Sequence, residues 1–306
     1  MNILPEIRQA LAGGMPIVAL ESTIVAHGFP YPDNLTVAQA LHNAVRNAGA
    51  IPAMIAINNG VVQVGLDDRG MECIVECDNV EKVGITDIAA VSALGKHGAT
   101  TVSASIRIAA IAGIEVFATG GLGGVHRHAH GVNDKTFDIS ADLVAMSRTP
   151  ITVVSSGAKM LLDLPATMEA LESLGVPVLG FGIKEFPAFY VSSSGVPLRH
   201  RFDSMSELAH AVQIHRQLGT ESGLLVCNPP PVDAELDAED LSRWVDQALV
   251  QAKNDKVSGS SVTPYVLDLL HELSSGATIT CNKALAISNA ALAGHLAVAL
   301  TTLPSI

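Results

Sequence analysis

Short apolar runs alternate with amphipathic stretches along most of the 306-residue chain. A continuous apolar run that is bounded by turn residues is typical of a strand buried on both faces of a parallel sheet. The sequence therefore predicts a strand that begins at Val116 and further strands at residues 16–23, 53–57, 61–66, 71–80, 151–155, 178–181, 186–192 and 223–227.

Helices are predicted between these strands, because apolar residues recur there every three or four positions and capping residues precede them. Asp33 or Asn34 caps a helix that ends near residue 47, and Thr86 opens a short helix that ends at Gly95. Lys159 is expected to enter a helix. The other predicted helices cover residues 100–113, 165–174, 204–218, 238–254, 264–273 and 280–300.

The alternation of strands and helices predicts an α/β fold, in which a largely parallel sheet is covered by helices on both faces. No fixed-period repeat is visible, and regular structure resumes at once on both sides of the proline run at 229–231. We therefore expect a single domain over residues 1–306, with a helical C-terminal part.

Charge and composition narrow the class of function. The formal net charge of −12 argues against a general nucleic-acid or membrane-surface binder, although a few lysines or backbone N–H groups suffice to hold one phosphate. The N-terminal residues lack a signal-peptide pattern, and the four cysteines form no C-x-x-C pair, so we expect reduced thiols in a cytoplasmic protein. The apolar stretch 284–300 contains Ser288, Asn289 and His295, which fits a buried helix better than a membrane span.

The most informative segment is residues 116–143, in which an apolar strand breaks into a glycine-rich turn. Glycines allow the backbone to turn tightly or to approach a ligand closely. The turn does not match the dinucleotide fingerprint, because His126 stands where G-x-G-x-x-G requires its third glycine. The chain also lacks a G-x-x-x-x-G-K-[ST] phosphate loop, so an enzyme that depends on NAD or a nucleoside triphosphate is not expected.

Histidines and aspartates follow this turn. The segment H-R-H-A-H that starts at His126 places three imidazoles on one face of an extended chain, but such tracts are usually solvated, and we expect only His126 to face a site. Asp138 and Asp142 flank a serine, and a hard divalent cation binds such carboxylate oxygens. Helix capping by Asp138 or Ser140 explains the same pattern, so both interpretations stay open.

Lys159 follows the predicted strand 151–155 at the point where the chain turns into a helix. A partly desolvated lysine has a lowered pKa, and its amine then reacts as a nucleophile with carbonyl carbon. The alternative is a surface lysine in a first helical turn, although the helix dipole disfavours positive charge there. Ser156 and Lys159 also match S-x-x-K, but the companion elements of that acyl-transfer pattern are missing.

Glu21 ends the first apolar run. Ligands of open α/β sheets bind beyond the carboxyl ends of the strands. A carboxyl group in that position is a candidate general acid with a raised pKa, and a turn or capping role is the alternative.

Six motifs follow one another in a specific order, namely ALESTI at 19–24, GATTV at 98–102, FATGG at 117–121, GGVHR at 123–127, DISADL at 138–143 and GAK at 157–159. Together they resemble the pseudouridine-5′-phosphate glycosidase family, also called indigoidine synthase A-like, from about Pro16 to the C-terminus. The resemblance implies an α/β/α sandwich around a mostly parallel, mixed sheet, and a homotrimer.

The resemblance also implies an activity, which is the reversible cleavage of pseudouridine 5′-phosphate to uracil and ribose 5-phosphate with a divalent cation, usually Mn²⁺. A C–C glycosidic bond has no heteroatom leaving group that an acid can protonate. The family's solution, as the resemblance implies, is a general acid that helps to open the ribose ring and a lysine that forms an imine at C1′.

Carried over by motif, Glu21 is the proton donor, Lys159 the nucleophile and Asp138 the metal ligand. The remaining residues implied for the sugar phosphate are Lys82, Thr101, Val102, Ser140, Ala141 and Asp142, and those implied near the base are Thr119, His126 and Asn289. The segment between His126 and Asp138 is longer than in the usual form of the family, which leaves the choice of substrate open.

Three alternatives accompany this prediction. The first is an aldolase that acts on sugar phosphates through a lysine imine, and the second is a glycosidase for a different C-nucleoside phosphate. The third is a sugar-phosphate binding protein without catalysis, against which the presence of Glu21, Lys159 and Asp138 counts.

Overall fold

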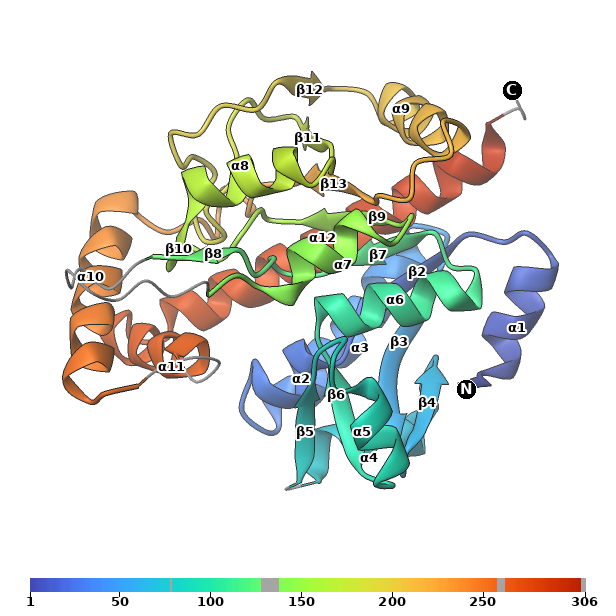
Figure 1. The fold of residues 1–306 in the computed structure, drawn as a ribbon, viewed down its shortest axis with the longest axis horizontal. Coiled ribbons are helices and arrows are strands. Elements are labelled where there is room, and N and C mark those ends of the chain that lie inside the picture. The colour runs from blue at the N-terminus through green and yellow to red at the C-terminus, as the bar shows by residue number, and fades with distance from the viewer. Residues whose placement is uncertain (78, 128–137, 258–261, 304–306) are drawn as a thin grey trace.

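The computed structural model describes residues 1–77, 79–127, 138–257 and 262–303. A long sheet runs through the molecule, with helices on both faces (Figure 1). Its strands follow the order β1-β4-β3-β2-β7-β9-β13-β11-β12, and β6 joins β5 to β3. The strands are β1 (Asn2–Ile3), β2 (Ile17–Glu21), β3 (Ile51–Asn58), β4 (Val61–Val64), β5 (Val80–Val83), β6 (His97–Thr100), β7 (Val116–Ala118), β9 (Thr152–Ser155), β11 (Val178–Phe181), β12 (His200–Phe202) and β13 (Leu224–Cys227).

Most neighbouring strands of this sheet are parallel, because helices connect them. Among the described strands of this sheet, the antiparallel pairs are β3 with β4 and β3 with β6. A separate two-stranded ribbon joins β8 (Val125–His126) to β10 (Leu162–Asp163). The predicted α/β fold with a mostly parallel, mixed sheet is thus confirmed.

The helices are α1 (Pro5–Ala12), α2 (Thr23–His27), α3 (Asp33–Asn47), α4 (Asp68–Glu76), α5 (Ile88–Ala93), α6 (Val102–Ala112), α7 (Ala141–Ser147), α8 (Leu164–Ser173), α9 (Met205–Gln217), α10 (Ala238–Asn254), α11 (Val262–Leu273) and α12 (Ala277–Thr302). Figure 1 shows α6 and α7 in front of the sheet, with α12 and α3 behind it. The central strands are therefore covered on both sides, which explains why β2 is buried along its whole length.

The helix α12 is long and apolar enough to cross a membrane by length and composition, with a mean hydropathy of 1.5 over its most apolar window. It packs, however, against α3, β2, β7 and β9, and half of that window is buried inside the protein. Its role in this fold is that of a core helix, in agreement with the prediction for residues 284–300.

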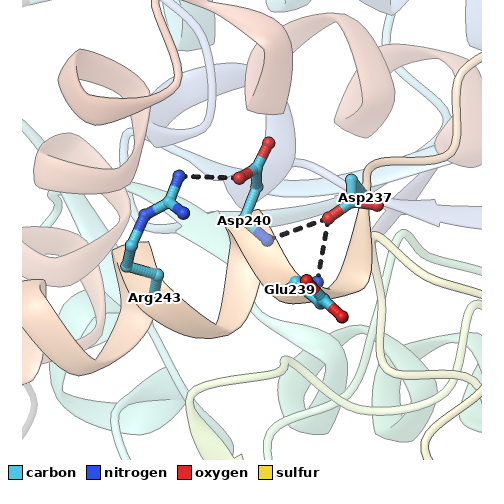
Figure 2. A network of polar contacts seen from close by, with 4 residues as sticks. All are labelled: Asp237, Glu239, Asp240 and Arg243. Carbon is cyan, nitrogen blue, oxygen red and sulfur yellow. Dashed lines mark hydrogen bonds and ion pairs between the residues drawn. The ribbon is translucent and has the colours of Figure 1, made fainter.

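The N-terminus of α10 shows how local sequence sets a helix boundary (Figure 2). The Asp237 carboxylate accepts hydrogen bonds from the backbone N–H groups of Glu239 and Asp240, both at 3.0 Å. One turn later, the Arg243 guanidinium donates to Asp240 at 2.6 Å. The cap satisfies N–H groups that have no partner within the helix, and the observed bounds equal the predicted ones.

Two strand predictions are wrong. Residues 71–80 were expected to be a strand, but α4 occupies residues 68–76, and only β5 follows as a strand. The Asp67 side chain caps α4 by accepting from the Gly70 N–H at 2.8 Å. Met71 and Ile74 are both buried, and their three-residue spacing fits one face of a helix.

The short strand β6 was missed, because His97–Thr100 contains little apolar sequence.

Residues 186–192 do not form the predicted strand either. Phe189 has a φ of +64°, a left-handed conformation that interrupts an extended chain. The Ala188 N–H donates back to the Val191 carbonyl at 3.0 Å, which closes a turn. Lys159 does not enter a helix, since α8 begins only at Leu164, so the helix-dipole argument for this lysine does not apply.

Candidate functional site

The carboxyl ends of β2, β7 and β9 lie side by side, because these strands are consecutive and parallel in the sheet. They border a cavity of about 720 Å³. Of the residues predicted for the site, Glu21, Lys82, Thr119 and Lys159 line this cavity. Those that do not line it, among the described residues, are Thr101, Val102, His126, Asp138, Ser140, Ala141, Asp142 and Asn289.

Glu21 is the last residue of β2, and it is only 8% exposed. Its carboxylate accepts a hydrogen bond from the Thr119 hydroxyl. Burial raises the pKa of Glu21 to about 7, which outweighs the lowering by the Thr119 hydrogen bond and by the charge of Lys159. Asp142 adds a further negative charge that raises this pKa. A carboxyl group that titrates near neutral pH can donate and accept a proton under ordinary conditions.

The turn after β7 carries Thr119 to the cavity, and Asn289 of α12 holds this turn from behind. Asn289 has no exposed surface, and its amide nitrogen donates to the carbonyls of Thr119 at 2.8 Å and Gly120 at 3.2 Å. Its amide oxygen accepts from Asn228 at 2.9 Å. The structure therefore places Asn289 behind the turn, where it positions Thr119, and not on the cavity wall. Asn282, earlier on the same helix, lines the cavity.

Lys159 lies in the loop between β9 and β10, and it is half-buried. The loop is tied to its neighbours by backbone groups, since the Lys159 N–H donates to the Leu122 carbonyl at 3.1 Å. Arg127, directly after β8, also contacts the loop, because its guanidinium donates to the carbonyls of Met160 and Leu162, each at 3.1 Å. These contacts direct a lysine from an irregular segment toward the cavity.

Lys82 reaches the cavity from β5, where it pairs with Ala99 of β6. Its side chain is exposed, yet partial desolvation lowers its pKa, and the charge of Lys159 lowers it further. Glu21 and Asp142 act in the opposite direction. Two lysines in a chain of strongly negative net charge make this cavity suited to an anion.

Asp142 lies in the first turn of α7, and its side chain contacts the N-terminus of α6. Its carboxylate accepts from the backbone N–H of Ser103 at 2.9 Å and from that of Gly123 at 3.0 Å. Thr101 is the N-cap residue of α6 and Val102 its buried first residue. Asp142 therefore joins the glycine turn to the start of this helix.

Ser140 caps α7, because its hydroxyl accepts from the Asp142 N–H at 3.2 Å. The capping alternative is thus correct for this serine. Ala141 is the exposed first residue of α7. Gly123 packs so closely on Ser140 that a Cβ atom would collide with the serine side chain, which explains a glycine at this point of the turn.

Asp138 and His126 lie beside each other across a short backbone pairing. The His126 N–H donates to the Asp138 carbonyl at 3.0 Å, and the two side chains approach to 4.0 Å between Nδ1 and Oδ2. Burial lowers the pKa of His126, Asp138 raises it, and Lys159 lowers it further. Within the described residues no three His, Cys, Asp or Glu side chains are grouped as a metal site, and His128 and His130 lie outside them.

The structure adds residues to which the sequence motifs gave no role. Phe189, Tyr190 and His271 line the cavity together with Asn282, and so does His27, which follows the first motif. The Phe189 and Tyr190 rings are tilted, with centroids 4.6 Å apart. Adjacent aromatic residues are uncommon in a chain with 4% aromatic residues, and this pair could have indicated the cavity wall. The sequence pattern instead predicted a strand that contains both residues.

Phe189 is held against the glycine turn. Its backbone N–H donates to the Ser156 carbonyl at 3.1 Å, and its ring lies so close to Gly121 that a Cβ atom there would collide with it. Gly157 has a φ of +72°, and a Cβ at this position would collide with the Pro187 carbonyl. Two segments that are distant in sequence thus form one wall.

Comparisons with known proteins agree on one family. The family model described as "Indigoidine synthase A like protein" matches residues 6–299. The chain is 49% identical over 302 residues to the pseudouridine-5′-phosphate glycosidase of Jannaschia sp. (strain CCS1), covering 99% of each chain. It is 47% identical over 300 residues to the enzyme of the same name from Paracoccus denitrificans (strain Pd 1222), covering 97% of each chain.

Two solved structures share the fold. The prealnumycin C-glycosynthase AlnA in complex with ribulose 5-phosphate is 36% identical, with a TM-score of 0.90 over 98% of this chain and 96% of the other. An indigoidine synthase A-like protein from Thermotoga maritima is 34% identical, with a TM-score of 0.87 and the same shares covered.

Proposed function

The chain belongs to the indigoidine synthase A-like family, and we propose that it reversibly cleaves the C–C glycosidic bond of pseudouridine 5′-phosphate to uracil and ribose 5-phosphate. The family predicted from the motifs is confirmed, and full-length relatives carry the corresponding enzyme name. One observation carries the chemistry: buried Glu21, with a pKa of about 7, and Lys159 line the same cavity. Residues 1–306 act as one catalytic domain in this proposal.

Glu21 is the general acid of the proposed reaction. The carbon leaving group of a C-nucleoside cannot be activated by protonating a heteroatom at the bond that breaks. Proton transfer from Glu21 to the ribose ring oxygen instead opens the sugar ring. A pKa of about 7 keeps a large fraction of this carboxyl group protonated near neutral pH.

Lys159 is the nucleophile. After ring opening, its amine attacks C1′ of the sugar and forms a C–N bond. The imine forms as the C–C bond breaks, because the nitrogen lone pair makes the C=N bond while the bonding electron pair leaves with the base. The base leaves as uracil after its carbon gains a proton, and water releases ribose 5-phosphate from the lysine. Overall, one water molecule is consumed for each glycosidic bond that is cleaved.

The remaining predicted residues hold the substrate. Lys82 supplies a second positive charge at the cavity. Thr101, Val102, Ser140, Ala141 and Asp142 complete the sugar-phosphate site in the proposal, and their support is the family resemblance. Thr119 and His126 lie toward the base, and Thr119 also binds Glu21 directly.

Asp138 is the proposed ligand of a divalent cation, Mn²⁺ or a similar ion, with His126 beside it. The half-exposed carboxylate and an imidazole with a lowered pKa fit this group, because manganese accepts oxygen and neutral nitrogen donors and water fills its other positions. A bound cation would supply positive charge near the sugar phosphate. Asp138→Ala should abolish manganese-dependent activity while the circular dichroism spectrum stays unchanged; unchanged metal dependence would refute the assignment.

The proposal includes a homotrimer in the cytoplasm. Family resemblance supports the trimer, and four free cysteines fit a reducing compartment. Light scattering on the purified protein measures the oligomeric mass directly.

The decisive experiment follows uracil release from pseudouridine 5′-phosphate in the presence of manganese. Release should be rapid for the native chain and absent for Lys159→Ala. A folded protein that binds ribose 5-phosphate but releases no uracil would exclude this activity and leave a lysine-imine aldolase as the alternative.

A borohydride experiment tests the covalent step separately. With ribose 5-phosphate, reduction should add the mass of the sugar to Lys159. The matched control is Lys82→Ala, which removes the other cavity lysine. With the concentration of ribose 5-phosphate raised to offset its weaker binding, this variant should keep the label on Lys159. A label that persists in Lys159→Ala would show that another amine is the nucleophile.

A second candidate function is favoured by one comparison. AlnA, which shares the fold at 36% identity, is a C-glycosynthase, so this fold also serves the synthetic direction. A glycosidase for a different C-nucleoside phosphate is therefore the alternative. Competition between uracil and other ring nucleophiles for ribose 5-phosphate separates the two, since the preferred acceptor identifies the substrate.

A further inference from the structure

A second cluster of reactive side chains lies at the C-terminal end of α4, outside the cavity lining. The Sγ atoms of Cys73 and Cys77 are 3.4 Å apart, and the Cys73 Sγ is 3.2 Å from Nδ1 of His97. Cys77 is exposed, and Cys73 is partly buried. Both thiols are free, so the cluster is a dithiol with an imidazole next to its inner member.

The backbone at this point permits a disulfide. Cysteines one turn apart on a helix have Cα atoms about 6 Å apart, which falls within the range of about 4.4–6.8 Å found for disulfides. Cys77 is the C-cap residue, where the chain leaves the helix with a ψ of 129°. Its N–H bond to the Cys73 carbonyl is long, at 3.3 Å, so this last turn can tighten without disturbing the rest of α4.

The surroundings assign different roles to the two thiols. Because Cys77 is exposed, it meets a dissolved oxidant first. Burial and the neighbouring thiol raise the pKa of Cys73 to about 11, so this residue is a poor first nucleophile. The Nδ1 atom of His97 is close enough to accept the Cys73 proton when that thiol reacts.

We propose that Cys73 and Cys77 form a reversibly oxidisable pair that closes to an intramolecular disulfide when the protein meets hydrogen peroxide. The Cys77 thiolate attacks one peroxide oxygen, and the O–O bond breaks to give a sulfenic acid and hydroxide, which becomes water with the thiol proton. The Cys73 sulfur then attacks the Cys77 sulfur, and the hydroxyl group leaves as a second water.

This sequence of steps balances. Two thiols and one peroxide give one disulfide and two water molecules, so the protein loses two electrons and two protons, and the peroxide is reduced. His97 takes part only by receiving the Cys73 proton on its way to the leaving hydroxyl group. Transient disulfides of this kind occur in otherwise reducing compartments.

The other two cysteines serve as internal controls. Cys227 and Cys281 are fully buried, and the Cys281 thiol donates to the Tyr190 carbonyl at 3.8 Å. A metal site is a less suitable assignment for the cluster, because the described residues contain no three-ligand group.

The test uses the full chain, treated with hydrogen peroxide, alkylated and digested with trypsin. Residues 70–82 form one peptide that contains both cysteines. It should lose two hydrogen atoms and resist alkylation, and dithiothreitol should reverse both changes. Cys227 and Cys281 should react with the alkylating reagent only after denaturation. An unmodified peptide, or one with irreversibly oxidised Cys77 and free Cys73, would overturn the proposal.

Three variants test the assigned roles. Cys73→Ser should stop at the sulfenic acid, which dimedone traps, whereas Cys77→Ser should remove the reaction with peroxide. His97→Asn should prolong the life of the sulfenic acid without preventing its formation. Disulfide-linked dimers through Cys77, or a zinc ion bound to both thiols of the purified protein, would each contradict an intramolecular redox pair.

Discussion

The molecule contains two regions in which a carboxylate is buried to the same extent, the end of β2 and the start of α7. Glu21 and Asp142 are each 8% exposed. Asp142 accepts hydrogen bonds from two backbone N–H groups, whereas Glu21 accepts one from the Thr119 hydroxyl. The two carboxylates are thus equally buried but have different hydrogen-bond donors. Backbone groups satisfy Asp142, whereas burial raises the pKa of Glu21 to about 7.

The difference separates a carboxyl group that faces the cavity from one that holds backbone segments together. Backbone donors stabilise a carboxylate in one geometry, and at Asp142 they connect the glycine turn to α6. Glu21 faces a cavity with two lysines and lacks such donors in the described structure. The two regions also interact, because the charge of Asp142 raises the pKa of Glu21.

The largest expected effect comes from removing the exchangeable proton. Glu21→Gln keeps the shape of the side chain, and we expect kcat for uracil release to fall by roughly 10²–10⁴-fold, the usual contribution of a general acid. The matched control is Glu169→Gln on the exposed side of α8, which should leave the rate unchanged. A fall of less than about tenfold would show that Glu21 is not the acid.

The pH dependence of stability should show the raised pKa directly. The folded state holds its proton on Glu21 up to about pH 7, while the unfolded chain releases it near 4.5. The stabilisation from this difference, about 3 kcal/mol, is complete below pH 4.5 and is lost as pH rises to about 7. Urea unfolding of the native chain and of Glu21→Gln measures it, and a difference between them that does not vary with pH would contradict the assignment.

Asp142→Asn should lower the stability of the fold more than it lowers the rate of uracil release. An amide group would then face a backbone N–H that now donates to a carboxylate, which costs about 1–3 kcal/mol of unfolding free energy. Removing the negative charge should also lower the pKa of Glu21 and move the pH profile of uracil release to lower pH. Stability equal to that of the native chain would show that the two backbone contacts contribute little.

The smallest expected effect is at Thr119. Its hydroxyl lowers the pKa of Glu21, so Thr119→Val should raise this pKa and move the alkaline limb of the activity profile to higher pH. We expect the maximal rate to change by less than about tenfold, because the proton itself is retained. Thr119→Ser keeps the hydroxyl and should restore the native profile; an unshifted profile in the valine variant would disconnect the hydrogen bond from the titration.

Much of the fold could be predicted from local sequence. Continuous apolar runs identify β2, β9 and β13, and a capping aspartate sets the start of α10. Residues 71–80 were assigned to a strand because alternation over a few positions resembles one face of a short helix. Phe189 was misplaced because its left-handed backbone depends on a contact with Ser156 that is distant in sequence.

The motifs also indicated part of the candidate site, since the order of these short segments identified the family, and Glu21 and Lys159 lie in them. Asn282 and Asn289 show the limit of this approach. Both lie on α12, yet only Asn282 lines the cavity, and only Asn289 holds the turn that carries Thr119. Which face of a helix meets a cavity depends on what packs against it.

Residue types and local spacing were therefore sufficient for the class of fold and the family, and they identified Glu21 and Lys159 as candidates, because these properties depend on near neighbours in the chain. The pKa of Glu21, the supporting role of Asp142 and the pairing of Cys73 with His97 emerged only in the folded molecule. Burial, hydrogen bonds and charge act through space over a few ångströms, and the groups that supply them here come from segments far apart in sequence.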